Sequence, residues 1–143
     1  AEQFGLQDRG DLGPRAGELH RVVHDALAAA DTLATHGVSA EVVDLRTLVP
    51  LDVETIFESV RRTTRAVVVH DAVQFAGPGA EIAAILQAEL FGELSAPVER
   101  VGARFVPNPA AAALEAQVYP SPESIVAAAQ RTLESARRAE VRG

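Results

Sequence analysis

Hydrophobic and polar side chains follow two different periodicities along this chain, and the periodicity changes at glycine and proline residues. Residues 14–36 place apolar side chains three and four positions apart, the spacing of an amphipathic helix, and Gly37 follows as a left-handed stop. Residues 40–45 and 66–70 are short and mostly apolar, which is typical of strands buried on both faces. The pattern therefore predicts a helix followed by alternating strands and helices.

The rest of the chain continues this alternation. Asp52 is suited to cap a second helix, a Gly-Pro-Gly turn precedes a third helix over about residues 80–91, and residues 98–101 form a short strand. Ser121 followed by Pro122 is a strong start signal for a last helix. This order is typical of a parallel sheet covered by helices. We predict an α/β fold, a three-layer α/β/α domain with three or four short, mostly parallel strands.

The chain of 143 residues has the length of one domain. We expect a flexible leader over residues 1–13, one domain over residues 14–139 and a frayed tail over residues 140–143. The sequence contains no methionine. We therefore expect it to be a processed product or part of a longer polypeptide.

Composition excludes several classes of function. A net charge of −7 argues against nucleic-acid binding, and no apolar run approaches the roughly 20 residues that span a bilayer. The absence of cysteine excludes a thiolate nucleophile and fits a reducing, cytoplasmic location. All basic residues are arginine, so a lysine Schiff base is also excluded. We predict no catalytic, cofactor-binding or metal-binding residue in this chain.

Four motifs in unbroken order carry a family resemblance. DLRTLVPLD, VVVHDA, GPGAEIAA and LEAQVYPSPESIVAAA resemble the C-terminal domain of transketolase-like proteins, and most of all the beta subunit of thiamine-diphosphate-dependent 2-oxo acid dehydrogenases of the pyruvate or branched-chain type. The resemblance covers roughly residues 20–136. It implies a three-layer α/β/α domain that does not itself hold the cofactor.

In such proteins thiamine diphosphate and magnesium bind a Gly-Asp-Gly…Asn motif on another domain or subunit. Here Gly10-Asp11 is followed by Leu12, and no asparagine lies at a matching distance. The resemblance therefore implies a subunit-association domain that is not catalytic by itself. Its partners would be a second copy in a homodimer, an alpha-type subunit and the acyltransferase core of a 2-oxo acid dehydrogenase complex.

The sequence departs from the family before the first helix. Members carry a strand of the type DVTIVAYG there, in the middle of the sheet, and residues 1–19 contain no segment of comparable hydrophobicity. Either residues 42–45 and 66–70 become direct neighbours, or a second molecule fills the gap. A truncated or miscloned product is the third possibility. Unpaired strand edges favour self-association.

Candidate site residues gather after the strand of residues 66–70. His70 and Asp71 end that strand, where ligands bind in open α/β sheets, and His70 could shuttle a proton. We favour a structural role, with His70 hydrogen-bonded to the following loop. Gly77 and Gly79 could cradle an anion at a helix N-terminus, but Glu81 in the first turn would repel it. A tight helix entry is the favoured interpretation.

Two further candidates concern interfaces. Phe75 lies on the same loop and could be an exposed aromatic anchor. Arg46 follows a strand end, where it could clamp a carboxylate or be held by Asp44, Asp52 or Glu115. An alternative function is therefore a stand-alone domain that binds a small anion in the crevice of Arg46, His70 and the Gly-Pro-Gly turn.

Overall fold

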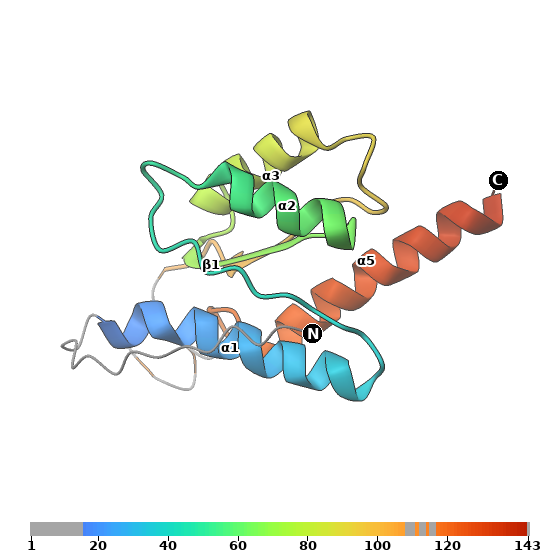
Figure 1. Ribbon diagram of the computed structural model, residues 1–143. Coiled ribbons are helices and arrows are strands. Elements are labelled where there is room, and N and C mark those ends of the chain that lie inside the picture. The colour runs from blue at the N-terminus through green and yellow to red at the C-terminus, as the bar shows by residue number, and fades with distance from the viewer. Residues whose placement is uncertain (1–15, 108–110, 112–113, 115–116, 143) are drawn as a thin grey trace.

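The helices and strands of the chain follow the expected alternation. The computed structural model describes residues 16–107, 111, 114 and 117–142 (Figure 1), so the expected leader over residues 1–13 lies outside this part. The elements are α1 (Ala16–Thr35), α2 (Val53–Thr63), β1 (Val67–Val73), α3 (Pro78–Glu89), β2 (Glu99–Ala103) and α5 (Pro122–Arg142). No helix among the described residues is long and apolar enough to cross a membrane.

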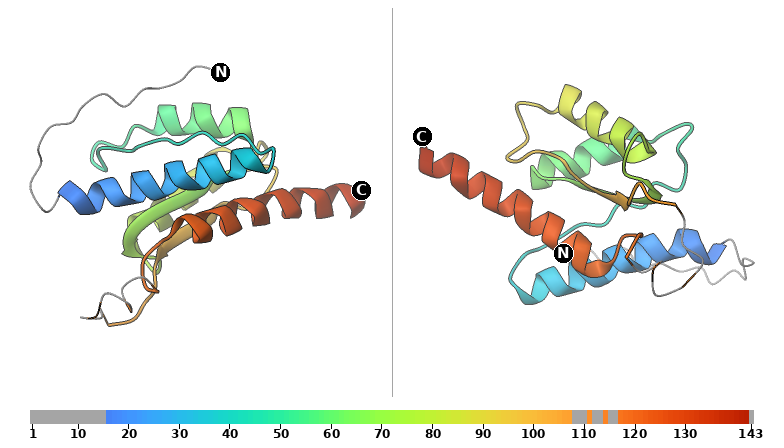
Figure 2. Two further views of the ribbon diagram at one scale, coloured as in Figure 1. Left: turned by 90° about the horizontal axis from the view of Figure 1, so that it is seen from below. Right: turned by 180° about the vertical axis from the view of Figure 1, so that it is seen from behind.

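The elements form three layers, with a small parallel sheet between two layers of helices (Figures 1 and 2). Strands β1 and β2 pair in parallel, with Val67 opposite Glu99 and Val69 opposite Val101. Helices α2 and α3 cover one face of this sheet, and α1 and α5 cover the other (Figures 1 and 2). The predicted α/β fold with an α/β/α arrangement is confirmed.

Each face of the sheet has its own core. Apolar residues of α2, α3 and the C-cap of α3 form the first: Ile56, Val60, Ile82, Leu86 and Leu90. The second joins α1, β2 and α5: Ala29, Val101, Ile125 and Ala128. The valines of β1 contact both cores, because alternate side chains of a strand point to opposite faces.

The helix boundaries follow local chemistry. Asp52 caps α2, since its carboxylate accepts hydrogen bonds from the Thr55 backbone amide at 3.1 Å and hydroxyl at 2.7 Å. These bonds lower the pKa of Asp52. Gly37 has φ of 76° and ends α1 as expected, and the Ser121 hydroxyl accepts from the Ser124 amide at 3.3 Å at the start of α5.

The strands differ most from expectation. Residues 40–45 do not form a strand, and within the described part of the chain the sheet contains only β1 and β2. The first alternative, direct pairing of residues 42–45 with the strand after α2, is therefore wrong. The physical reason is that residues 40–45 run beside the sheet but form no backbone hydrogen bonds with any strand that the structure describes.

The other boundaries move by a few residues. Strand β1 continues to Val73, and β2 ends at Ala103 rather than at residue 101, because the two strands pair again at that point. Helix α5 extends from Pro122 to Arg142. Neither glycine nor proline interrupts α5 after Pro122, which explains its length.

Candidate functional site

The middle of β1 holds His70 in a pocket made by glycines, because the strand continues to Val73 and does not end at His70 as expected. A Cβ atom at Gly79 would overlap Nε2 and Cδ2 of the His70 ring, and Cβ atoms at Gly77 and Gly102 would each lie 2.9 Å from its Cε1. Side chains at these three positions would therefore collide with the imidazole. The glycines of the Gly-Pro-Gly turn give close packing against β1, in line with the favoured interpretation.

His70 is held by contact rather than by hydrogen bonds. Within the described residues neither ring nitrogen has a hydrogen-bond partner. Burial lowers the pKa of His70, the Ala72 backbone and the Asp71 carboxylate oppose this effect, and Arg100 adds to it. The Ala72 contact favours the charged ring without reaching hydrogen-bond geometry. The expected hydrogen bond from His70 to the loop is therefore not formed, and the ring is neutral at pH 7.

Asp71 lies within β1 and connects this strand to α1. Arg21 Nη2 of α1 donates a hydrogen bond to Asp71 Oδ1 at 2.8 Å. The guanidinium of Arg21 also lies 4.9 Å from the centre of the Tyr119 ring. Asp71 thus has a structural partner, and the only signal for Arg21 in the sequence is its place near the start of the apolar stripe.

Arg46 is mostly in solvent. Its side chain is 77% exposed, and its Nε lies 3.8 Å from Asp44 Oδ2. Of the three expected partners, Asp44 is the one it contacts, Asp52 is used as the cap of α2, and Glu115 lies outside the described residues. Such an exposed, loose ion pair contributes little to stability.

The entry to α3 is built without an anion-binding side chain. Gly77 is the N-cap residue and has no side chain to form a capping bond, and Pro78 occupies the first helical position. Glu81 is exposed in the first turn, where a carboxylate suits the helix dipole. These features describe a compact turn packed against His70.

Large apolar side chains are exposed at the carboxyl edge of the sheet. Phe75 and Phe105 follow β1 and β2, are 73% and 79% exposed, and place their ring centres 5.7 Å apart. Val49 follows residues 40–46, which run in the same direction as β1 (Figures 1 and 2), and is 92% exposed. We define the carboxyl-edge patch as Leu48, Val49, Phe75, Phe105 and Val106.

Phe105 and Val106 were not among the residues expected from the sequence. The available signal was the apolar pair that continues past the strand of residues 98–101 and stops at Pro107. Phe75 was expected as an exposed aromatic, and the structure places it in solvent beside Phe105.

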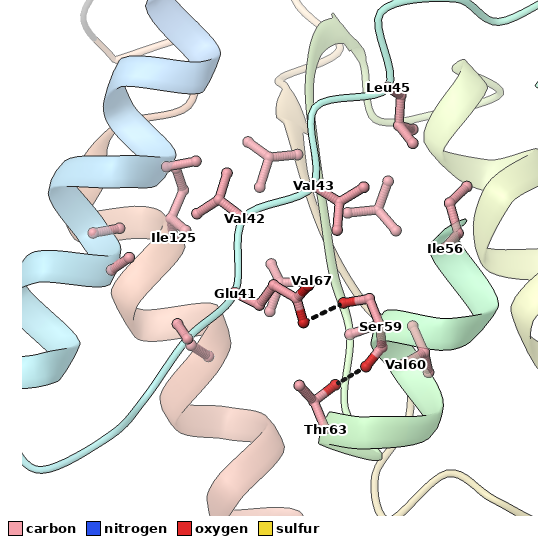
Figure 3. Close-up of a pocket in the computed structure, with 18 of the residues that line it drawn as sticks. Glu41, Val42, Val43, Leu45, Ile56, Ser59, Val60, Thr63, Val67 and Ile125 are labelled. Atoms are coloured by element: carbon pink, nitrogen blue, oxygen red, sulfur yellow. Dashed lines mark hydrogen bonds between the residues drawn. The ribbon is translucent and has the colours of Figure 1, made fainter. Parts of the chain in front are cut away.

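A cavity of about 770 Å³ separates residues 40–46 from β1. Figure 3 shows its walls, with Val42 and Ile125 on one side and Val43 and Val60 on the other. Arg46, His70 and Gly79 all line this cavity. The structure therefore brings Arg46, His70 and Gly79 of the expected crevice to one hollow, but Gly77 does not line it and the walls are mainly aliphatic.

The described residues do not fit a magnesium diphosphate. No group of three or more histidine or acidic side chains among them is placed to hold a metal ion. The buried His70 and the turn at Gly77 offer no charged side chain for a diphosphate. We derive no chemical step through such a group.

Comparison with known proteins decides the family. Residues 21–125 match the family described as "Transketolase, C-terminal domain". The chain belongs to the transketolase C-terminal domain family. Its described features, an α/β domain with a parallel sheet between two helical layers, agree with that membership.

This transketolase C-terminal domain is similar to subunits of larger enzymes. It is 46% identical over 106 residues to the pyruvate dehydrogenase E1 component subunit beta of Rickettsia bellii (strain RML369-C), covering 74% of this chain and 33% of that protein. It is 48% identical over 111 residues to the mitochondrial pyruvate dehydrogenase E1 component subunit beta of Pisum sativum, and the match covers 78% of this chain and 31% of that protein.

A third relative carries a different activity in its name. The chain is 45% identical over 112 residues to the acetoin:2,6-dichlorophenolindophenol oxidoreductase subunit beta of Cupriavidus necator, covering 78% of this chain and 33% of that protein. The chain thus spans about a third of the length of the curated relatives it matches.

Proposed function

We propose that this domain is a subunit-association domain of a thiamine-diphosphate-dependent 2-oxo acid dehydrogenase or transketolase-like enzyme, without catalytic activity by itself. The printed names of the relatives support this proposal, because each describes a beta subunit. The parent enzyme would decarboxylate a 2-oxo acid and pass the acyl group to a lipoyl carrier. Thiamine diphosphate and magnesium would bind elsewhere in that enzyme.

The exposed carboxyl-edge patch is the observation that carries the proposal. Monomeric proteins expose single apolar residues freely, but clustered aromatic side chains on exposed loops are typical of contact surfaces. Phe75 and Phe105 contact each other and remain mostly in solvent. A partner that covers both rings would bury a preformed aromatic pair with little loss of side-chain entropy.

We propose a homodimer as the first partner of this surface, with an alpha-type subunit and the acyltransferase core as further partners. The absence of cysteine supports a reducing, cytoplasmic compartment as the place of assembly. The net charge of −7 and the neutral His70 pocket do not favour a polyanionic partner.

Sedimentation equilibrium over a series of protein concentrations tests the homodimer. We expect reversible self-association, weakened by about tenfold or more when Phe75→Ser and Phe105→Ser are combined, because hot-spot aromatics carry most of an interface's energy. Phe91→Ser is the matched control, since Phe91 is 75% exposed but follows α3 at the opposite edge. A monomer at every concentration would refute the homodimer.

Activity measurements test the other half of the proposal. Purified protein, supplied with thiamine diphosphate, magnesium and either pyruvate or a branched 2-oxo acid, should produce no carbon dioxide above the rate of the buffer alone. Turnover by this chain without a companion protein would overturn the assignment as an association domain.

A second candidate function is binding of a small anion. It is favoured by one observation, that Arg46, His70 and Gly79 line the same cavity. Titration calorimetry with inorganic phosphate and acetate tests it. Saturable binding that disappears in Arg46→Ala would support this candidate, and no heat of binding would leave the association domain as the better assignment.

A further inference from the structure

We propose that His70 is an acid-sensitive switch of the carboxyl-edge patch: a proton gained by its imidazole drives the ring out of the pocket of glycines and releases the turn that carries Phe75. This turn consists of residues 74–77, and we call it the Phe75 turn. The inference rests on the proposed function, because Phe75 belongs to the surface at which two copies are expected to meet.

The His70 ring fills the space between the start of α3 and strand β2. A Cβ atom at Gly79 would overlap its Nε2 and Cδ2 atoms, and one at Gly77 would lie 2.9 Å from its Cε1. On β2, a Cβ atom at Gly102 would lie 2.9 Å from the same Cε1 and 3.0 Å from the Cα atom of Gln74. The ring therefore packs against Gly77 and lies close to Gln74, at both ends of the Phe75 turn.

Hydrogen bonds to β2 fix one end of the Phe75 turn. The Gln74 amide donates to the backbone of β2 at 2.9 Å, Arg100 Nη1 donates to the Gln74 carbonyl at 3.1 Å, and Gln74 Nε2 donates to the Arg100 carbonyl at 3.1 Å. At the other end, the Gly77 carbonyl accepts from the Ala80 amide of α3 at 2.9 Å, and this helix start packs on the His70 ring. The ring therefore supports the end of the turn that no described strand holds by a hydrogen bond.

Ala76 shows that the Phe75 turn is held in an unfavourable conformation. Its φ of 53° lies in the left-handed region, where a Cβ atom crowds the backbone. A residue of this kind persists when its surroundings fix it and relaxes when they do not. Loss of the support from His70 would therefore let the turn rearrange, and would move the exposed Phe75 ring away from the Phe105 ring that it now contacts.

The pocket of His70 does not accommodate a charged ring. Both ring nitrogens are buried, and the described residues place no hydrogen-bond partner at either of them. A protonated imidazole carries two N–H donors, and burying both without acceptors is unfavourable. Gly79 places the ring beside the first turn of α3, where the positive end of the helix dipole adds to this effect. A proton on His70 therefore favours the state in which the ring reaches water.

The charged side chains on the two strands agree with a neutral ring. Asp71, the next residue of β1, already accepts a hydrogen bond from Arg21 at 2.8 Å. Arg100 of β2 donates to a backbone carbonyl and adds a positive charge near the ring. Burial is the largest cause of the lowered pKa of His70, Arg100 adds to it, and the Ala72 backbone and Asp71 oppose it without reversing it.

The charges on the other neighbouring elements are screened. Glu81 of α3 is exposed to solvent. On the segment of residues 40–46, Arg46 and Asp44 are exposed and oppose each other, with 3.8 Å between Arg46 Nε and Asp44 Oδ2. Such groups interact weakly with a buried ring, because water and dissolved ions screen them. They leave the neutral form of His70 favoured in the pocket.

The lowered pKa sets the direction and the size of the expected response. In the released turn His70 has the ordinary pKa of about 6.5, and in the pocket its pKa is lower. The pocket therefore holds the ring fully above about pH 6.5 and loses this preference as the pH falls towards the lower value. Within that interval each pH unit raises the ratio of released to held turns by about tenfold.

An NMR titration of the intact chain tests the release directly. The His70 ring should gain its proton at a lower pH than histidine in an unstructured peptide. Amide exchange at Gln74 and Ala80, corrected for the intrinsic effect of pH, should rise by up to about tenfold per pH unit below about pH 6.5, whereas exchange at Leu86 in α3 should not. A ring that gains its proton at the ordinary pH, or that gains it while both amides stay protected, would overturn the inference.

Sedimentation equilibrium at about pH 7.5 and about pH 5.5, on either side of the ordinary histidine pKa, tests the link to the carboxyl-edge patch. In about 0.3 M salt, which screens the overall charge, self-association should be weakened at the lower pH by about fourfold or more, the effect of releasing half of the turns in each of two copies. Unchanged affinity would refute the switch. A chain that is monomeric already at the higher pH would refute the proposed homodimer instead, and amide exchange alone would then decide whether His70 releases the turn.

Two variants assign the response to one histidine. His70→Gln cannot gain a proton and should remove the pH dependence of both measurements, whereas His36→Gln should retain it, because His36 is exposed after the last turn of α1. Circular dichroism verifies that each variant is folded. If His70→Gln does not fold, the ring titration of the parent chain remains the decisive test. A pH response that persists in folded His70→Gln, or that disappears in His36→Gln, would overturn the assignment to His70.

Discussion

Replacing Gly79 with alanine tests the close packing of the His70 ring. Gly79 lies in the first turn of α3, where alanine alone would stabilise the helix by about 0.5–1 kcal/mol. Its Cβ would overlap Nε2 and Cδ2 of His70 and lie 3.3 Å from Val68 Cγ1. Overpacking of this kind costs about 1–3 kcal/mol. The balance predicts that Gly79→Ala lowers the free energy of unfolding by about 1–2 kcal/mol.

Removing the ring should reverse the sign of this effect. In a His70→Ala background the obstacle is absent, so Gly79→Ala should raise the free energy of unfolding by about 0.5 kcal/mol. Gly77→Ala is the matched control, because its Cβ would also overlap the backbone carbonyl oxygen of Val73. His70→Ala cannot remove that obstacle and should not rescue Gly77→Ala.

Urea denaturation followed by circular dichroism gives the required free energies. The parent chain, the two single variants and the double variant should show a coupling energy between Gly79 and His70 of about 1.5–2.5 kcal/mol. A Gly79→Ala protein as stable as the parent chain, or one that His70→Ala does not rescue, would show that the ring is not fixed by the glycines.

Three further predictions concern stability. Glu41→Gln should make the free energy of unfolding depend less on pH in the acid range. The Arg62 hydrogen bond lowers the pKa of Glu41 from its usual 4.5, so the ionised carboxylate contributes its full stabilisation above pH 4.5. This stabilisation is lost as the pH falls through the lower pKa of the folded state. Asp52→Ala should lower the melting temperature and Asp52→Asn should largely preserve it at pH 7, since asparagine also caps helices. Leu86→Ala should cost about 2–5 kcal/mol in urea denaturation, whereas exposed Leu48→Ala should stay within about 0.5 kcal/mol; similar losses for both would contradict the assigned core.

The helices were predictable because their signals are local. The apolar stripe before Gly37, the cap at Asp52 and the Ser121-Pro122 start each act within one or two turns, and the structure places α1, α2 and α5 at those signals. The family was predictable for a related reason, since four motifs in fixed order carry it and the matched residues 21–125 contain nearly all of them.

Residues 40–45 show what local patterns cannot decide. Their apolar composition is that of a buried strand, and Val42 and Val43 do point to opposite sides. A strand exists only when a neighbour accepts its hydrogen bonds, however, and that neighbour is specified elsewhere in the sequence. The prediction of a strand was therefore wrong, although the side-chain alternation that suggested it is present.

The candidate site was predictable in its location but not in its contacts. The residues after β1 gather at the carboxyl edge as the parallel topology requires, and Phe75 is exposed there. The contact of Phe105 with Phe75 and that of Arg21 with Asp71 join residues 30 and 50 positions apart (105 − 75 and 71 − 21), and one sequence does not reveal such pairs. The space for the His70 ring also depends on Gly102, which lies on a different strand.

The division of the interior into two cores has a consequence for the order in which the domain assembles. The core of α2 and α3 draws all its members from residues 45–98, an uninterrupted stretch with short connections. The other core joins Ala29 to Ile125, and closing so long a loop costs more chain entropy. We therefore expect the central half of the chain to fold first, with the terminal helices docking afterwards. Folding rates should then respond to substitutions in the α2–α3 core, and unfolding rates to those at the α1–α5 contact.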